Sequence, residues 1–208
     1  MNSISILLRK ERPEEFRAVE EMVRNVFWDL YEPGAVEHYL VHTLRTAEVL
    51  VPELTLAAEV NGEIAGVIYY TKAKISGDSG EIPVLTFGPL AVASAMQKQG
   101  VGSRLVTETA RLAREAGHRA VLIYGNPAYY SRFGFEPGEK YGIADMEGNF
   151  CDALQVLVLN GDPAELRGKF EEGDAFHLDP AAAKAFDAGF PPRKKHKLPT
   201  QIFDGPPD

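Results

Sequence analysis

The stretch Leu90–Arg104 reads LAVASAMQKQGVGSR, and it decides which fold this chain can form. An apolar strand runs into it and a long amphipathic helix runs out of it. Gly100 and Gly102 have no Cβ, so backbone amides can come close to a ligand there. The helix that follows directs its unpaired N–H groups and its positive dipole end at the same point. The pattern therefore predicts a phosphate-binding loop at Gln97–Ser103.

This loop differs from two common phosphate-binding motifs. A Walker loop needs Gly-Lys followed by Ser or Thr, and a dinucleotide fingerprint needs a third spaced glycine. The sequence has neither at this place. Lys98 and Arg104 could add positive charge for an anion. The alternative interpretation is an ordinary strand-to-helix turn that uses glycine.

Amphipathic helices and short strands surround the loop. Asn61-Gly62 favours a two-residue hairpin turn, and Gly88-Pro89 predicts irregular strand pairing because proline has no N–H donor. Ser76–Gly80 is expected to be a loop. In chain order, the predicted elements are a strand at Ile4–Arg9, helices at Pro13–Leu30 and about Val36–Ala47, strands at Leu54–Val60, Glu63–Tyr70 and Val84–Val92, a helix at about Gln99–Ala116, a strand at Ala120–Tyr124, a short helix at Asn126–Phe133 and a strand at Ala153–Leu159.

The last part of the chain has a different character. After Gly161 it is rich in proline, and it carries a basic run at Arg193–Lys197 and one weak helix at about Pro180–Ala188. We expect residues 1–160 to form one domain and residues 161–208 to form a partly irregular C-terminal extension. This extension could cap a cleft, mediate a homodimer, or do both.

Composition limits the partners and the compartment. The chain has 208 residues, 45% of them apolar, and a net charge of −8. An acidic surface repels nucleic acid and anionic lipid, so neither is an expected partner. Cys151 is the single cysteine, so no internal disulfide can form, and we expect it to be a small buried side chain. The sequence shows no signal-peptide pattern and no membrane-length apolar run, which favours a cytoplasmic protein.

A metal site is not expected. His38 and His42 have ligand spacing on one helix face, but the zincin pattern needs Glu directly after the first His, and Tyr39 stands there. No third ligand is suggested by the sequence. The two histidines are therefore expected at the surface.

The sequence resembles the GNAT (Gcn5-related) N-acetyltransferase superfamily. Gln97-x-x-Gly100-x-Gly102 is similar to its motif A, and Leu90-Ala91-Val92 matches the strand before that motif. The segment NPAYYSRFGF at Asn126–Phe135 resembles a later helix, with a tyrosine four residues before a Gly-Phe pair. The run Phe87–Phe135 is most similar to the YhbS-like branch. The resemblance implies an α/β (α+β) fold, in which a twisted, mixed, mostly antiparallel sheet carries helices on both faces. The parallel strands should part near Leu90–Val92 and Ala120–Tyr124 and form a slot for CoA.

The resemblance also implies which residues bind acetyl-CoA, the co-substrate of the family. They are Leu90, Ala91, Val92, Gln97, Lys98, Gln99, Gly100, Val101, Gly102, Ser103, Asn126 and Tyr130. Tyr130 matches the tyrosine that serves as general acid toward the leaving thiolate. A core aromatic, or a phenol that only orients the CoA sulfur, is the alternative. Asn126 would contact the pantetheine arm, cap the helix that follows, or do both.

The general base is harder to assign. Family members often carry a carboxylate on the strand that here is Val84–Leu90, and this strand has none. Glu81 precedes it, and Thr86 and Tyr69 could touch a water chain. We therefore expect a water relay. A base or relay is needed because an amine with a pKa near 10.4 is almost entirely protonated at pH 7.

The acceptor site is expected between the first two helices. Trp28, Asp29, Tyr31 and Glu32 combine aromatic and acidic side chains that could hold a cation. A hydrophobic helix end followed by a solvated turn is the alternative. Together these features predict an N-acetyltransferase that acts on an amine by direct attack in a ternary complex. Two alternatives stay open: a non-catalytic acyl-CoA-binding regulatory module, and an acyltransferase with a longer acyl donor.

Overall fold

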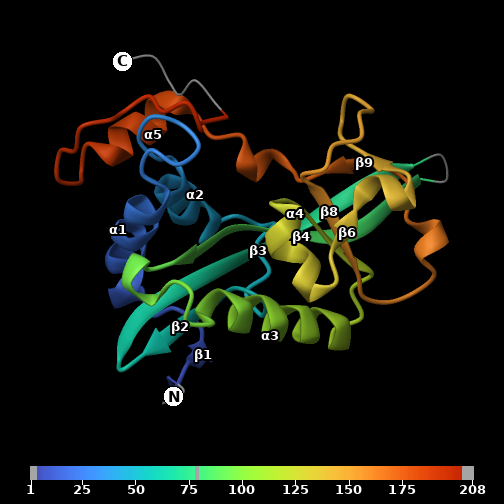
Figure 1. Cartoon of the computed structure of the whole chain (residues 1–208), viewed down its shortest axis with the longest axis horizontal. Helices are drawn as coiled ribbons and strands as arrows, with labels where there is room; N and C mark the ends of the chain where they lie inside the picture. Colours follow the sequence, from blue (N-terminus) through green and yellow to red (C-terminus); the bar gives the residue numbers. More distant parts are fainter. Residues whose placement is uncertain (1–3, 78–79, 203–208) are drawn as a thin grey trace.

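The chain folds into one sheet with helices on both faces in the computed structural model, which describes residues 4–77 and 80–202 (Figure 1). Its strands are β1 (Leu7–Arg9), β2 (Leu56–Val60), β3 (Glu63–Gly77), β4 (Gly80–Val92), β5 (Ala120–Tyr124), β6 (Glu136–Pro137), β7 (Ile143–Ala144), β8 (Leu154–Val158) and β9 (Gly168–Glu171). Its helices are α1 (Phe16–Phe27), α2 (Glu37–Leu44), α3 (Val101–Glu115), α4 (Pro127–Tyr130) and α5 (Pro180–Asp187).

The two long strands β3 and β4 form the middle of the sheet. Neighbouring strands follow the order β1-β2-β3-β4-β5-β8-β6, and β9 pairs with β3 and β7. The pairs β4–β5 and β7–β9 are parallel, and the other pairs are antiparallel. The predicted fold class, with its mixed and mostly antiparallel sheet, is confirmed.

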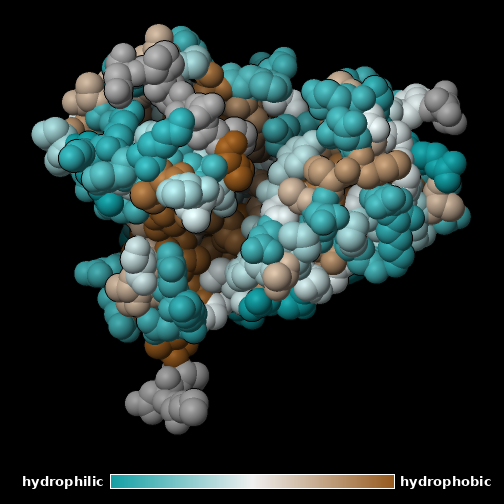
Figure 2. All heavy atoms as spheres, turned by 45° about the horizontal axis from the view of Figure 1, so that its top comes forward, coloured by the Kyte–Doolittle hydropathy of each residue, from teal (hydrophilic) through white to brown (hydrophobic). Residues whose placement is uncertain are grey.

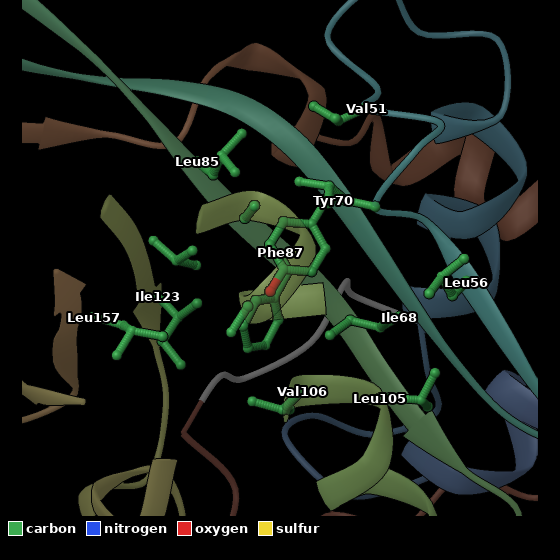
Figure 3. Packing of buried hydrophobic residues seen from close by; sticks show 14 of the residues in the cluster. Val51, Leu56, Ile68, Tyr70, Leu85, Phe87, Leu105, Val106, Ile123 and Leu157 are labelled. Atoms are coloured by element: carbon green, nitrogen blue, oxygen red, sulfur yellow. The ribbon is translucent and has the colours of Figure 1, made fainter. Parts of the chain in front are cut away.

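Alternation along the strands explains the two helical layers. Ile68 and Tyr70 pack on the face that α3 covers, and Val67 and Tyr69 pack on the face of α1 and α2. Successive side chains of a strand point to opposite faces, so one apolar strand supplies both cores. Figure 3 shows Tyr70 beside Phe87 in the first of these cores; their ring centroids are 5.1 Å apart.

Turn residues produce the predicted breaks. Asn61 and Gly62 both have positive φ, 53° and 85°, and they join Val60 to Glu63 in a two-residue hairpin. The ladder between β3 and β4 shifts register between Ile68 and Tyr70, opposite the predicted irregularity at Gly88-Pro89. A two-residue hairpin turn and a local bulge are thus both encoded in short sequence motifs.

Strands β3 and β4 are longer than predicted. The expected loop at Ser76–Gly80 is reduced, because Ser76 and Gly77 still pair with β4; positions 78 and 79 lie outside the described residues. Ile75 is fully buried and stands opposite Phe170 of β9, which comes from the C-terminal extension. The extended part of β3 pairs with β4 on one side and with β9 on the other, and this second partner is far away in the sequence.

The C-terminal extension packs on the rest of the chain at two places. Strand β9 joins the sheet, and α5 lies over α1 and α2, where Asp187 pairs with Arg24 at 2.6 Å. Helix α5 also covers His38, which is fully buried 3.0 Å from Asp187, so the prediction of a surface histidine is wrong at this position. The segments between these elements are irregular. The division of the chain at residue 160 and a homodimer stay predictions.

Candidate active site

The predicted phosphate loop connects the end of β4 to the start of α3. Gly100 is the N-cap residue of α3, with a φ of 89°, and no side chain caps the helix there. The first amides of a helix have no intrahelical acceptor, so those of Val101, Gly102 and Ser103 are available to an anion. The loop therefore offers backbone donors at the positive end of a 15-residue helix.

Two glutamines of the loop bind the loop itself. Nε2 of Gln97 donates to the carbonyl of Val92 at 3.2 Å, and Nε2 of Gln99 donates to the carbonyl of Ala95 at 2.8 Å. These bonds hold the loop in shape. The geometry therefore favours a structural role for both glutamine side chains.

A cavity of about 710 Å³ lies in front of this loop. Ten of the residues predicted to bind the cofactor line it: Leu90, Val92, Gln97, Lys98, Gly100, Val101, Gly102, Ser103, Asn126 and Tyr130. The other two do not. Ala91 is fully buried in the core under α1 and α2, because it points to the other face of the sheet, and Gln99 is turned toward Ala95. We call this space the cofactor cavity.

Other side chains also line the cofactor cavity, among them three that were not predicted to bind the cofactor. Tyr124 and Tyr129 line it, and so does Arg132, whose guanidinium lies 4.8 Å from the centre of the Tyr129 ring. The Tyr129 hydroxyl comes so close to Gly102 that a Cβ on Gly102 would lie 2.8 Å from it. The signal available for Arg132 was a basic residue three positions after Tyr129, about one helical turn later.

The cofactor cavity opens where two parallel strands separate. Strands β4 and β5 pair at Leu85 and Val121, and toward their C-terminal ends the pairing stops. Asn126 follows β5 and caps α4, since its Oδ1 accepts from the amide of Ala128 at 2.9 Å. The two strands separate as predicted, and binding of CoA between them stays a prediction. One of the two roles suggested for Asn126, the helix cap, is observed.

A second cavity, of about 330 Å³, continues from the first. The two cavities share Val26, Tyr31, Leu90, Tyr124 and Tyr130, so Tyr130 stands at their junction. Apolar and aromatic side chains form much of the wall, among them Phe27, Leu30, Leu40, Phe87, Ile123 and Phe176. Figure 2 shows a hydrophobic hollow between two more hydrophilic parts of the surface. We call this second space the acceptor cavity.

The ring of Tyr130 is fixed by its neighbours. It packs 5.9 Å from Phe87 and 5.5 Å from Phe135 between ring centroids. A Cβ on Gly125 would lie 2.5 Å from Cε2 of Tyr130, so only glycine leaves room for the ring. Burial raises the pKa of the Tyr130 phenol, with smaller contributions from other tyrosines. The phenol therefore stays protonated near neutral pH and can donate a hydrogen bond.

Two carboxylates that the sequence prediction missed line the acceptor cavity. Glu37 begins α2, and its Oε2 accepts from the amide of Val36 at 3.1 Å. Burial raises the pKa of Glu37 to about 7. Burial also raises the pKa of Glu172, which follows β9, and His177 opposes that shift. Within residues 4–77 and 80–202, neither carboxylate has a salt-bridge partner.

Of the four predicted acceptor residues, only Tyr31 lines a cavity. Trp28 is buried between the guanidinium groups of Arg24 and Arg193, and its Nε1 donates to the carbonyl of Lys194 at 3.2 Å. The predicted substrate contact of Trp28 is therefore wrong. The reason is that the C-terminal extension folds back onto the segment between α1 and α2.

Asp29 is also held by the C-terminal extension. It accepts from the amide of Gly34 at 2.8 Å and pairs with the imidazole of His196 at 2.8 Å. Its own φ is 58°, in the left-handed region. Asp29 therefore fixes the turn after α1 and does not line either cavity, and Glu32 in the same turn does not line them either.

Other chemical groups lie outside these cavities. Cys151 is exposed, so its predicted burial is wrong; it follows the turn at Asp145–Asn149 and precedes β8, where no core covers it. Among the described residues, no three His, Cys, Asp or Glu side chains gather as a metal ion would require. In the same part of the chain, none of the helices has the length and apolar character that crossing a bilayer demands.

Comparisons with known proteins agree with this geometry. The model of the acetyltransferase (GNAT) domain family matches residues 8–138. The N-acetyltransferase YhbS of Escherichia coli is 31% identical over 157 residues, which are 76% of this chain and 89% of that protein. The N-acetyltransferase YjhQ of Escherichia coli is 36% identical over 142 residues, 65% of this chain and 77% of the other.

Solved structures show the same similarity. The crystal structure of YhbS from Escherichia coli in complex with CoA matches with a TM-score of 0.74 and 27% identity, covering 86% of this chain and 95% of that one. A GNAT acetyltransferase from Brucella melitensis in complex with acetyl-CoA matches with a TM-score of 0.67 and 27% identity, covering 83% and 98%.

Proposed function

This chain belongs to the GNAT acetyltransferase family, and on that premise we propose that it transfers the acetyl group of acetyl-CoA to an amine held in the acceptor cavity. The observation that carries the proposal is the junction of the two cavities at Tyr130. A ternary complex needs two binding spaces that meet at the reacting atoms, with water largely excluded.

The cofactor cavity would hold acetyl-CoA. The amides of Val101, Gly102 and Ser103 would bind the pyrophosphate, with Lys98 and Arg132 adding positive charge. Each helix-end contact with an anion is worth about 0.3–1 kcal/mol, and up to about 2 when partly buried. The pantetheine arm would follow the edge of β4 at Leu90–Val92. The complexes of YhbS with CoA and of the Brucella enzyme with acetyl-CoA support this assignment.

Glu37 is our candidate for the general base, in place of the water relay that the sequence suggested. An acceptor arrives as an ammonium ion, which has no lone pair. Glu37 lines the acceptor cavity, and its pKa of about 7 suits a group that takes up a proton near neutral pH. The neutral nitrogen then attacks the thioester carbon, and a C–N bond forms. Thr86, in the same wall, could position the amine or a water molecule.

Tyr130 is our candidate for the group that assists the leaving sulfur. The tetrahedral intermediate then loses its second nitrogen proton to water, and the C–S bond breaks. The phenol of Tyr130 gives its proton to the departing sulfur and is reprotonated from solvent. The raised pKa of Tyr130 keeps the phenol protonated until the sulfur leaves.

The apolar wall of the acceptor cavity also supports a second candidate, an acyltransferase with a longer acyl donor. Phe87, Leu40 and Phe176 would contact an extended acyl chain there. Turnover of acyl-CoA donors of increasing length distinguishes the two functions. A maximum at acetyl-CoA supports the acetyltransferase, and a maximum at a longer chain supports this second candidate.

Thermal unfolding tests cofactor binding first. Acetyl-CoA and CoA should raise Tm, because a ligand that binds only the native state stabilises it, whereas NAD and ATP should not. Gly102→Trp should abolish this shift and keep the fold, since the indole would fill the space in front of Tyr129. Release of free CoA with a panel of amines then tests catalysis. A Tm that acetyl-CoA leaves unchanged at millimolar concentration would contradict the proposal, and so would an unchanged affinity in the Gly102→Trp variant.

A further inference from the structure

The acceptor cavity continues into a groove on the surface. This groove, of about 420 Å³, is lined by Tyr124, Met146, Glu147, Phe170, Glu171, Glu172, Gly173, Asp174 and His177. It shares Tyr124 and Glu172 with the acceptor cavity. A molecule whose amine lies near Tyr130 can therefore extend past Glu172 to the outside.

The groove is acidic, and much of its charge is not neutralised by the protein. Four carboxylates line it, against one imidazole. Glu171 is engaged by Ser76 and Lys74, and Asp174 lies 3.9 Å from His177. Glu172 lies at the boundary of groove and cavity, half-buried, with no salt bridge within the described part of the chain. Taking an unpaired carboxylate out of water is unfavourable, and a cationic ligand would compensate for it.

The inner end of the cavity supplies a second, independent sign of a polar ligand. The Thr86 side chain is only 2% exposed, lines the cavity, and makes no side-chain hydrogen bond to any residue that the structure describes. Glu37 lies in the same wall. An amine at this point would satisfy both groups, while Glu172 remains available further out.

We propose that the acceptor is a dicationic amine: one amino group reacts beside Glu37 and Tyr130, and a second positive charge on the same molecule is held by Glu172. This inference rests on the proposed function and names its substrate class. Phe27, Phe87 and Phe176 line the same cavity as the two carboxylates, and this apolar lining suits a short carbon chain that joins the two charges.

The test compares alkyl monoamines with α,ω-diamines of equal chain length at saturating acetyl-CoA. We expect kcat/KM to be at least about tenfold higher for the best diamine than for the matched monoamine, which corresponds to about 1.4 kcal/mol. The preference should peak at one chain length, because the two carboxylates are fixed. Equal values for both series at every length would overturn the inference.

Two charge-neutralising variants make the test specific. Glu172→Gln should lower kcat/KM for each diamine to the value of the matched monoamine in the same variant, and so remove the diamine preference. Glu171→Gln removes the same charge one residue away, but Glu171 is already paired with Lys74, so this variant should keep the preference. Equal losses in both variants would point to a general charge effect and contradict the assignment to Glu172.

Further controls separate this inference from the proposed function. A monoamine that releases CoA supports the acetyltransferase even when diamines have no advantage. Where neither series turns over, calorimetry with CoA present decides: a diamine that fails to bind overturns the dicationic acceptor. A lysine followed by arginine in a short peptide presents the same chemistry, and lysine followed by alanine is its control. Better turnover of the free diamine than of either peptide would identify a small molecule as the source.

Discussion

The cofactor side and the acceptor side of this molecule differ in how they are built. Most of the cofactor cavity is formed by two continuous segments, Leu90–Ser103 and Tyr124–Arg132, and its donors include the uncapped amides at the start of α3. The acceptor cavity combines side chains from α1, α2, β4, β5, α4 and the segment after β9, and its first and last lining residues, Val26 and Phe176, are 150 positions apart. Binding through local backbone can be recognised in a sequence, whereas a wall assembled from distant side chains cannot. Each of the following variants tests whether a change on one side alters ligand binding or turnover on the other.

The largest effect is expected for Glu37→Gln, on the acceptor side. Loss of a general base should lower kcat/KM by about 10²–10⁴-fold and leave the Kd of acetyl-CoA unchanged. In the parent, kcat/KM should rise with pH up to about 7, where Glu37 loses its proton, and then level off. In the variant it should keep rising toward pH 9, because only the small neutral fraction of the amine reacts. Glu48→Gln, which removes an exposed carboxylate outside both cavities, is the control, and a parental pH profile in Glu37→Gln would contradict the assignment.

Tyr130→Phe acts where the two sides meet. Removing the phenol should lower kcat by about 10²–10³-fold, since a donor to the developing negative charge is lost. The Kd of acetyl-CoA should change little, because the ring still packs against Phe87 and Phe135. Tyr129→Phe is the matched control, because Tyr129 lines the cofactor cavity and not the acceptor cavity. Stopped-time assays of CoA release measure kcat for both variants. A kcat that falls equally in the two variants would remove the special role of Tyr130.

Gly100→Ala tests the cofactor side alone. Gly100 and Gly117 stand at the two ends of α3 with φ of 89° and 84°, and a Cβ on either would have no atom within 4 Å. Both alanine variants should lose about 1–2 kcal/mol of folding stability through backbone strain. Only Gly100→Ala should also raise the Kd of acetyl-CoA, by about tenfold, because it alters the donors that face the cofactor. Calorimetry measures these Kd values. The same Kd of acetyl-CoA in both variants would contradict the loop assignment.

The smallest effect on ligand binding and turnover is expected for Asp29→Ala. It removes the acceptor for the amides of Gly34 and His196, at a cost of about 1–3 kcal/mol in folding stability. This should lower Tm by about 2–4 °C for each kcal/mol. The KM of the acceptor should rise because Tyr31 and Glu37 lie on the released segment, while acetyl-CoA affinity should stay the same. An increase in the Kd of acetyl-CoA would show that the two sides are more strongly coupled than their contacts indicate.

Local sequence signals predicted the cofactor side better than the acceptor side. Glycines at positive φ, the Asn61-Gly62 turn and the period-two pattern of β3 are local signals, and each predicted its element. Most residues predicted for acetyl-CoA line one cavity for the same reason. Ala91 does not, because alternation along β4 turns its side chain to the opposite face.

The acceptor side was predicted poorly for a specific physical reason. Trp28 and Asp29 have the right chemistry for a cation site, but the C-terminal extension occupies them. Glu37 has the sequence position of an ordinary acidic residue at a helix start, and only the fold gives it its surroundings. Glu172 lies in a segment without periodicity. Contacts that join residues more than 160 positions apart leave no pattern in one sequence.

The separation along the chain also sets an order during synthesis. The ribosome releases every residue of the cofactor cavity by the time Arg132 has emerged. Glu172, Phe176 and the segment that holds Asp29 follow about 40 or more residues later. A nascent chain that ends after Phe170 therefore contains every residue that lines the cofactor cavity, but it lacks Glu172 and Phe176 of the acceptor cavity and the segment that holds Asp29.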